Sequence, residues 1–219
     1  MKNGEQSLAF FCSLSANEKS VMKKSIKPRK TPQQSRSWRT REDILQATAH
    51  LLNRQPLGEV STNHIAKKTG ISIGTLYKYY PNKDSILADL SLMYMRQDAE
   101  LFGQIFEKYV DRALDELLDE LVDVLMQLHE RDARVRGVVY QNLERLKLVT
   151  HAQNATQQIH AKGTKVVPRL DPALTWVAIS AINSAVHSMA QLSKQHQNWD
   201  FVRDVCRQTF GLLIKSART

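Results

Sequence analysis

From residue 37 onward, apolar residues recur at steps of three and four, the spacing that places side chains on one face of an α-helix. In the first such segment, SWRTREDILQATAHLLNRQ, the recurring positions are Ile44, Leu45, Thr48, Leu51 and Leu52. The turn sequence PLG at 56–58 ends the pattern. The segment therefore predicts an amphipathic helix.

Two short helices are predicted next, joined by a turn that contains glycine. In VSTNHIAKKTG, Ser61 is placed to cap a helix of about two turns, and Gly70 is placed to end it in a left-handed conformation. In ISIGTLYKYYPNK, Ser72 is a second N-cap for a helix over about 73–80, which Pro81 ends. A longer helix, capped by the following asparagine, completes the pattern of a helix-turn-helix.

The second short helix has residue types that suit contact with DNA. In a helix-turn-helix this helix lies in the major groove, and its N-terminal residues reach the base edges. Gly74 lets the groove wall approach, Thr75 and Lys78 offer a hydroxyl and a charge, and Tyr77 and Tyr79 offer hydroxyls to phosphates. We expect Leu76 and Tyr80 to anchor the helix to the core, as its inward face.

The stretch from Trp38 to about Asp98 resembles the DNA-binding domain of the TetR family of bacterial transcriptional regulators. The residues VSTNHIAKKTGISIGTLYKYYPNKDSIL follow the family pattern T-x-x-x-I-A-x-x-x-G-V-S-x-G-T-L-Y-x-[HY]-F-x-[SN]-K. Ser61 replaces the threonine, Ile71 the valine, and Tyr79-Tyr80 the commoner His-Phe or Tyr-Phe pair. The resemblance implies a helix-turn-helix over 61–80 with DNA contacts from Thr62, Asn63, Ile73, Gly74, Thr75, Tyr77, Lys78, Tyr79 and Lys83.

The rest of the chain is helical by pattern and contains no motif that names a chemistry. Asp171 followed by proline predicts a helix start, and the last two helices are expected over about 172–194 and 199–216. We therefore expect an all-α fold of about nine helices. Its expected parts are a basic flexible N-terminal arm at 1–37, a DNA-binding domain at 38–98 and a helical regulatory and dimerisation domain at 99–219.

The resemblance also implies two further properties of this larger domain. TetR-like proteins typically form homodimers through their last two helices, which predicts a palindromic operator in double-stranded DNA. They also sense a small hydrophobic or amphipathic effector in a cavity among the central helices. Large or polar residues on otherwise apolar segments could line that cavity or simply pack in the core: Phe102, Phe106, Tyr109, Met126, His129, Tyr140, Trp176, Asn183 and His187.

Charge is concentrated at the N-terminus. Residues 1–41 contain ten Lys and Arg against two Asp and Glu, a net of +8, while the whole chain has a net charge of +9. A solvated tail and a basic arm that follows a nucleic-acid backbone both fit this composition, and the helix-turn-helix that follows favours the arm. Because Met22 opens MKKSIKPRK like a natural start, residues 1–21 form either an upstream extension or part of the native protein.

Several classes of protein are disfavoured by the composition. Cys12 and Cys206 stand far apart and outside any metal or redox spacing, which is typical of free thiols in the cytoplasm. No apolar run is long enough for a membrane-spanning helix, so no membrane association is expected. No nucleophile-base pair or carboxylate pair can be named, so we expect no enzyme, metal or cofactor.

These observations leave two main hypotheses. The first is a ligand-responsive repressor that a small molecule releases from its operator. The alternative is a DNA-binding protein that responds to a protein partner and has no small-molecule effector.

Overall fold

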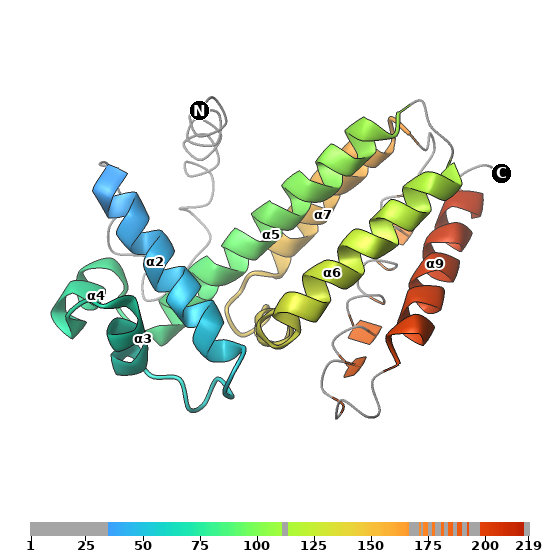
Figure 1. Ribbon diagram of the computed structural model, residues 1–219. Coiled ribbons are helices and arrows are strands. Elements are labelled where there is room, and N and C mark those ends of the chain that lie inside the picture. Colours follow the sequence, from blue (N-terminus) through green and yellow to red (C-terminus); the bar gives the residue numbers. More distant parts are fainter. Residues whose placement is uncertain are drawn as a thin grey trace. The chain divides into compact units, whose positions relative to one another are not determined.

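The computed structural model describes residues 35–110, 114–166 and 198–216, with isolated positions between 171 and 192 (Figure 1). The helices with defined bounds are α2 (Ser35–Leu52), α3 (Thr62–Thr69), α4 (Ile73–Tyr79), α5 (Lys83–Lys108), α6 (Leu114–Gln141), α7 (Val149–Gly163) and α9 (Trp199–Ser216). The described positions from 173 to 189 are helical as well. Within the described residues the all-α expectation is confirmed, and the number of helices there is close to the nine expected.

Contacts divide the chain into two compact units. The described part of the first contains residues 35–48 and 61–89, and the second contains 49–60 and the residues from 90 onward. Helices α2 and α5 each begin in the first unit and end in the second. The expected domain boundary at residue 98 falls inside the continuous helix α5, so the division into 38–98 and 99–219 stays a prediction.

The first unit is held by the apolar faces that the periodicity predicts. Ile44 of α2, Ile65 of α3, Leu76 of α4 and Ile86 of α5 are all fully buried. Thr48 is buried too, and its hydroxyl donates to the Ile44 carbonyl oxygen at 2.7 Å, which satisfies its polar atom inside the helix. Helices α3 and α4 pack directly against each other (Figure 1).

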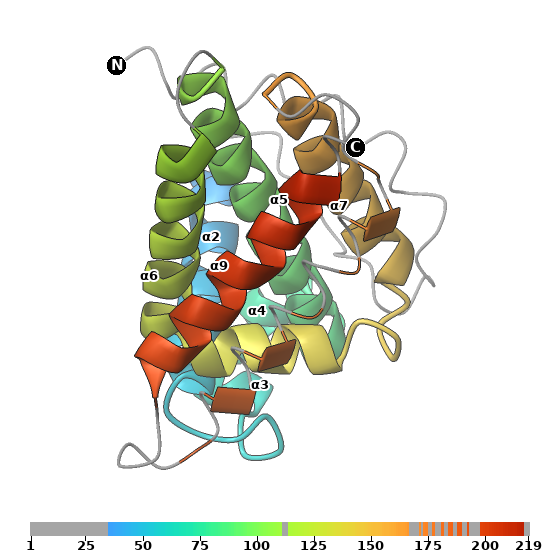
Figure 2. The same ribbon diagram turned by 90° about the vertical axis from the view of Figure 1, so that its right-hand side faces the viewer.

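In the second unit, α9 packs along α6 (Figure 2). Their shared core contains Val122, Leu125 and Met126 together with Val202 and Cys206. Two exposed ion pairs join the same helices, Arg203 to Asp123 and Arg207 to Asp119. The apolar contacts supply most of the stabilisation here, because exposed ion pairs are worth about 0–1 kcal/mol each.

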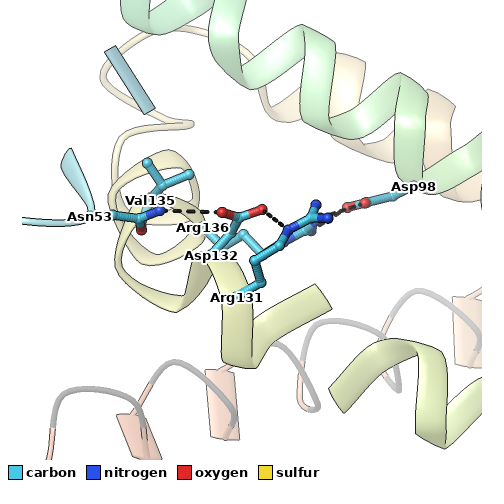
Figure 3. Close-up of polar contacts among 6 residues, drawn as sticks. All are labelled: Asn53, Asp98, Arg131, Asp132, Val135 and Arg136. Carbon is cyan, nitrogen blue, oxygen red and sulfur yellow. Dashed lines mark hydrogen bonds and ion pairs between the residues drawn. The ribbon is translucent and has the colours of Figure 1, made fainter. Parts of the chain in front are cut away.

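Helix α6 is interrupted at Asp132, whose backbone is not helical (φ −125°, ψ 23°). The segment after the break begins against Asn53, which follows the end of α2. The Asn53 amide nitrogen donates to the Asp132 carboxylate at 3.2 Å (Figure 3). The Asn53 side-chain oxygen accepts from the Val135 backbone N–H at 3.3 Å. Asn53 therefore acts as an N-cap supplied from elsewhere in the chain.

The same segment also holds α5. Arg136 is buried, and its guanidinium donates two hydrogen bonds to the Asp98 carboxylate, at 2.7 and 2.9 Å (Figure 3). It also lies 4.9 Å from the centroid of the Tyr94 ring. Burial lowers the pKa of Arg136, but the hydrogen bonds and charge of Asp98 outweigh this effect and raise that pKa above its ordinary value.

One helix end differs from the expectation, and a second has no signal in the sequence. Helix α4 ends at Tyr79, and Tyr80 is its extended C-cap (φ −131°, ψ 126°), because the proline that follows disfavours helical backbone in the residue before it. Helix α6 ends at Gln141, and a turn that includes Lys147 (φ 59°) precedes α7. No glycine or proline marks this second boundary in the sequence.

Candidate nucleic-acid interface

The turn between α3 and α4 is built by the residues that the sequence indicated. The Ser61 hydroxyl accepts from the His64 backbone N–H at 3.2 Å, and the Ser72 hydroxyl accepts from the Thr75 N–H at 3.1 Å. Gly70 has φ 74°, and its N–H donates to the Lys67 carbonyl oxygen at 3.2 Å. The predicted caps and the left-handed glycine are confirmed, and they fix a sharp turn between two short helices.

The inward face of α4 is also as expected. Leu76 and Tyr80 are fully buried, and Ile65 and Ala66 are the buried residues of α3. Because α4 is a seven-residue helix with one buried residue, its C-cap Tyr80 is a large part of its attachment to the core.

The outward face carries the predicted DNA contacts. Ile73 and Tyr77 are 37% and 40% exposed, Gly74 and Lys78 are exposed, and Thr75 is half-buried. On α3, Asn63 is exposed and Thr62 is half-buried. The structure therefore brings together, on one corner of the first unit, Thr62, Asn63, Ile73, Gly74, Thr75, Tyr77, Lys78 and Tyr79.

The hydroxyl groups of Tyr77 and Tyr79 each form a hydrogen bond with another hydroxyl group, and the sequence did not predict these bonds. The Tyr77 hydroxyl lies 3.1 Å from the Thr62 hydroxyl, and the Tyr79 hydroxyl lies 3.3 Å from that of Ser37. These hydrogen bonds hold the tyrosine rings against α3 and the N-terminal end of α2. A tyrosine hydroxyl can accept a hydrogen bond from Thr62 or Ser37 and still donate its own proton to a phosphate oxygen.

Lys83 opens α5 and is half-buried. Asn82 caps this helix, since its side-chain oxygen accepts from the Ser85 N–H at 2.8 Å. A lysine at a helix start favours an anion, because the helix dipole places partial positive charge there. We therefore keep Lys83 as a predicted phosphate contact at the edge of the same surface.

The charge of this corner suits a polyanion. From Val60 to Lys83 the sequence contains four lysines and no Asp or Glu. Lys67 and Lys68 of α3 are exposed, although they were not among the predicted contacts. Two consecutive lysines in a short helix could have indicated this exposure, because lysine is almost never fully buried.

A buried polar network lies beneath α4. The Asp89 carboxylate accepts the Tyr80 hydroxyl at 2.5 Å and the Arg41 Nε–H at 2.6 Å, and a second Arg41 nitrogen pairs with its other oxygen. Burial and the charge of Asp89 raise the pKa of Tyr80 well above its ordinary value, so the hydroxyl stays protonated and donates. The Arg41 guanidinium also lies 5.2 Å from the centroid of the Trp38 ring.

The predicted effector contacts lie in the second unit. Phe106 and Tyr109 are buried in one apolar cluster and Met126 in another, and Phe102 packs against both. The half-buried Tyr140 has a raised pKa, caused by burial and then by the charge of Asp98. Four other candidates lie outside the described residues or have side chains that are not described: His129, Trp176, Asn183 and His187.

The last two helices expose apolar side chains at the positions that the structure describes. Phe201 and Leu212 of α9 are 60% and 69% exposed. Leu174 and Val177, within the predicted helix at 172–194, are 48% and 60% exposed. Large exposed apolar side chains are candidates for an interaction surface where they form a contiguous patch.

Residues 44–90 match the family model for bacterial regulatory proteins of the tetR family. This segment belongs to the TetR family. The match covers α3, α4 and the turn between them, so the helix-turn-helix assignment is confirmed. Among curated protein sequences the comparison finds no match.

Solved TetR-family structures resemble the chain over most of its length. A TetR-family transcriptional regulator of Mesorhizobium loti covers 84% of this chain with 98% of its own, at a TM-score of 0.65 and 17% identity. One from Streptomyces coelicolor covers 80% with 98% of its own, at a TM-score of 0.60 and 17% identity. Thermus thermophilus FadR, a TetR-family repressor solved with lauroyl-CoA, covers 80% with 93% of its own, at 0.57 and 18% identity. The chain thus has the fold of TetR-family transcriptional regulators.

No described helix has both the length and the apolar character to span a membrane. No group of three or more His, Cys, Asp or Glu residues there is arranged to hold a metal ion.

Proposed function

We propose that the protein is a sequence-specific DNA-binding transcriptional regulator of the bacterial cytoplasm, without enzymatic activity. It binds a palindromic operator and represses transcription, and a small-molecule effector releases it from the operator. The observation that carries the proposal is the α3–α4 corner, with two capped short helices, a buried inner edge and an outer face of hydroxyls, amide and lysines. The family match of residues 44–90 supports it.

In this proposal α4 is the recognition helix and enters the major groove. Thr75 and Lys78 reach base edges, while Tyr77 and Tyr79 bind phosphates and fix the register of the helix. Ile73 contributes an apolar contact, such as one with a thymine methyl group. The basic arm before α2 adds phosphate contacts that do not depend on sequence.

We further propose a homodimer through the last two helices, about 172–194 and 199–216. The exposed Phe201 and Leu212 support this interface, because a dimer would remove both from water. Two-fold symmetry then presents two recognition helices to half-sites about one DNA turn apart. Phe201→Asp is expected to shift the protein to monomer in analytical ultracentrifugation, whereas an unchanged dimer would exclude Phe201 from the interface.

The proposed effector binds among α5, α6 and α7, where Phe102, Phe106 and Tyr109 meet apolar residues. A TetR-family neighbour, FadR, was solved with lauroyl-CoA, which supports a hydrophobic or amphipathic effector here. Movement of the second segment of α6 would displace Asn53, which directly follows α2, and Asp98 of α5. Both helices begin in the DNA-binding unit, so the effector can bias its conformation if it prefers the released state.

Two variants test the DNA-binding surface. Tyr77→Ala and Lys83→Ala should each weaken operator binding about tenfold, or by about 1.4 kcal/mol, and Lys83→Ala should also lower the salt slope by about one unit. Lys165→Ala, an exposed lysine of the second unit, is the matched control and should leave both quantities unchanged. Wild-type affinity in both test variants would refute the assignment of this surface.

The alternative, regulation by a protein partner, is separated from effector binding by one comparison. A panel of fatty acyl and other amphipathic compounds is added to the full-length protein, and thermal stability and operator affinity are measured. An effector raises the melting temperature by mass action and weakens operator binding. If the whole panel changes neither quantity while a partner protein changes operator affinity, the partner hypothesis replaces the effector hypothesis.

A further inference from the structure

We propose that Tyr80, Asp89 and Arg41 form a positioning network that sets the orientation of the recognition helix α4 and thereby the protein's ability to discriminate its operator from other DNA. The inference rests on the proposed DNA-binding function and assigns a specificity role to three residues that do not face DNA. Tyr80 and Asp89 are 0% and 2% exposed, and the Arg41 side chain is 13% exposed.

Helix α4 needs directional contacts to fix its orientation because it is short. It has seven residues, and Leu76 is its buried member, so its direction depends on what holds its two ends. Apolar contacts resist separation but are not directional, and they permit a small rotation or slide at little cost. At the N-terminal end the Ser72 cap supplies direction, and further along the helix the hydrogen bond between Tyr77 and Thr62 adds to it.

At the C-terminal end, the network supplies direction. The Tyr80 hydroxyl and the Arg41 guanidinium occupy both oxygens of one carboxylate, so Asp89 ties the C-cap of α4 to α2 and α5 at once. Two-point pairing of arginine with a carboxylate is geometrically strict. The Trp38 ring lies against the guanidinium and restricts it further.

The network acts next to the DNA-facing side chains. Tyr79 immediately precedes Tyr80, and its hydroxyl is braced by Ser37, one turn of α2 before Arg41. A rotation of Tyr80 in its site would therefore move Tyr79 relative to α2. Contacts with base edges depend on orientation, whereas attraction to phosphates depends mainly on charge, so such a movement should reduce specific binding and spare non-specific binding.

Tyr80→Phe is the direct test, since it removes one hydroxyl and keeps the buried ring. The full-length protein is titrated with its operator and with an unrelated duplex of equal length, well below the unfolding temperature. Operator affinity should fall at least fivefold while affinity for the unrelated duplex changes less than twofold, with an unchanged salt slope. Arg41→Lys keeps the charge but not the two-point pairing, and it should lower the same ratio.

Tyr94→Phe is the matched control. Tyr94 is a buried tyrosine of the second unit whose ring lies 4.9 Å from the Arg136 guanidinium, and it is not a proposed DNA or effector contact. It should leave the ratio of specific to non-specific affinity unchanged. The proposal is overturned if Tyr80→Phe and Arg41→Lys keep the wild-type ratio, or if all three variants lower it equally. If the wild-type protein itself selects no operator, the proposed function fails instead, so the two failures are distinguishable.

Discussion

Replacing Asn53 with alanine should remove the cap on the second segment of α6. Val135 is fully buried, so its N–H would lose the Asn53 oxygen and gain no water. An unsatisfied buried donor costs about 1–3 kcal/mol, and loss of an asparagine N-cap costs about 0.5–2 kcal/mol. Both figures describe the same hydrogen bond, so we expect the free energy of unfolding to fall by about 2 kcal/mol and not by their sum. Asn53 follows the last residue of α2, so alanine gains no helix propensity there.

The assay is thermal unfolding of the full-length protein at one fixed concentration, because a dimer's melting temperature depends on concentration. A loss of about 2 kcal/mol corresponds to a decrease of about 4–8 °C for a chain of this size. Gln46→Ala, which removes one exposed hydrogen bond within α2, is the control and should stay within about 0.5 kcal/mol of wild type. If Asn53→Ala and Gln46→Ala melt together, Asn53 does not cap this segment.

Asn53→Asp separates the two hydrogen bonds of the asparagine. It keeps an oxygen for the Val135 N–H but places a carboxylate against that of Asp132. Like charges raise the pKa of one carboxylate in the folded state, so the deficit relative to wild type should be greatest at neutral pH and shrink as the pH falls towards 4. A deficit that does not change with pH would contradict the close approach of these two side chains.

Three further predictions concern single positions. Gly70→Ala should lose about 1–2 kcal/mol in urea unfolding because of its positive φ, whereas Gly58→Ala, which has equally open space and no positive φ, should not. Burial raises the pKa of the Cys206 thiol to about 11, so this thiol should be unreactive in the folded protein. In a Cys12→Ser background, a thiol reagent at pH 8 should react with Cys206 only as fast as the protein unfolds, and immediate reaction would refute this. Because Tyr80 keeps its proton in the folded state above its ordinary pKa, stability should fall as the pH rises past 10, and Tyr80→Phe should fall less steeply.

The sequence was most informative where structure is decided locally. A serine before a short apolar pattern and a glycine after it are local signals, and they located the N-caps of α3 and α4 and the C-cap of α3 correctly. The proline after α4 located the end of that helix to within one residue. The buried Leu76 and Tyr80 followed from helical periodicity in the same way. The corner that faces DNA could therefore be predicted almost residue by residue, although its role as a binding site stays a prediction.

Contacts between distant segments could not be predicted in this way. Asp89 lies 48 residues from Arg41, and Asn53 lies 79 residues from Asp132, so no local pattern relates them. The break in α6 at Asp132 is stabilised by the second of these contacts, which joins α6 to the residue after α2. The same reasoning applies to the effector site, since core packing and ligand contact place the same apolar residues at the same helical spacing.

Selection of bound DNA from a random pool by the full-length protein, followed by sequencing, shows whether the α3–α4 corner reads a palindromic operator. We expect one enriched motif with two-fold symmetry and half-sites about one helical turn apart. Tyr77→Ala protein, selected in parallel, should enrich that motif weakly or not at all. Enrichment of no motif by the wild-type protein, or equal enrichment by both proteins, would exclude sequence-specific binding through this corner.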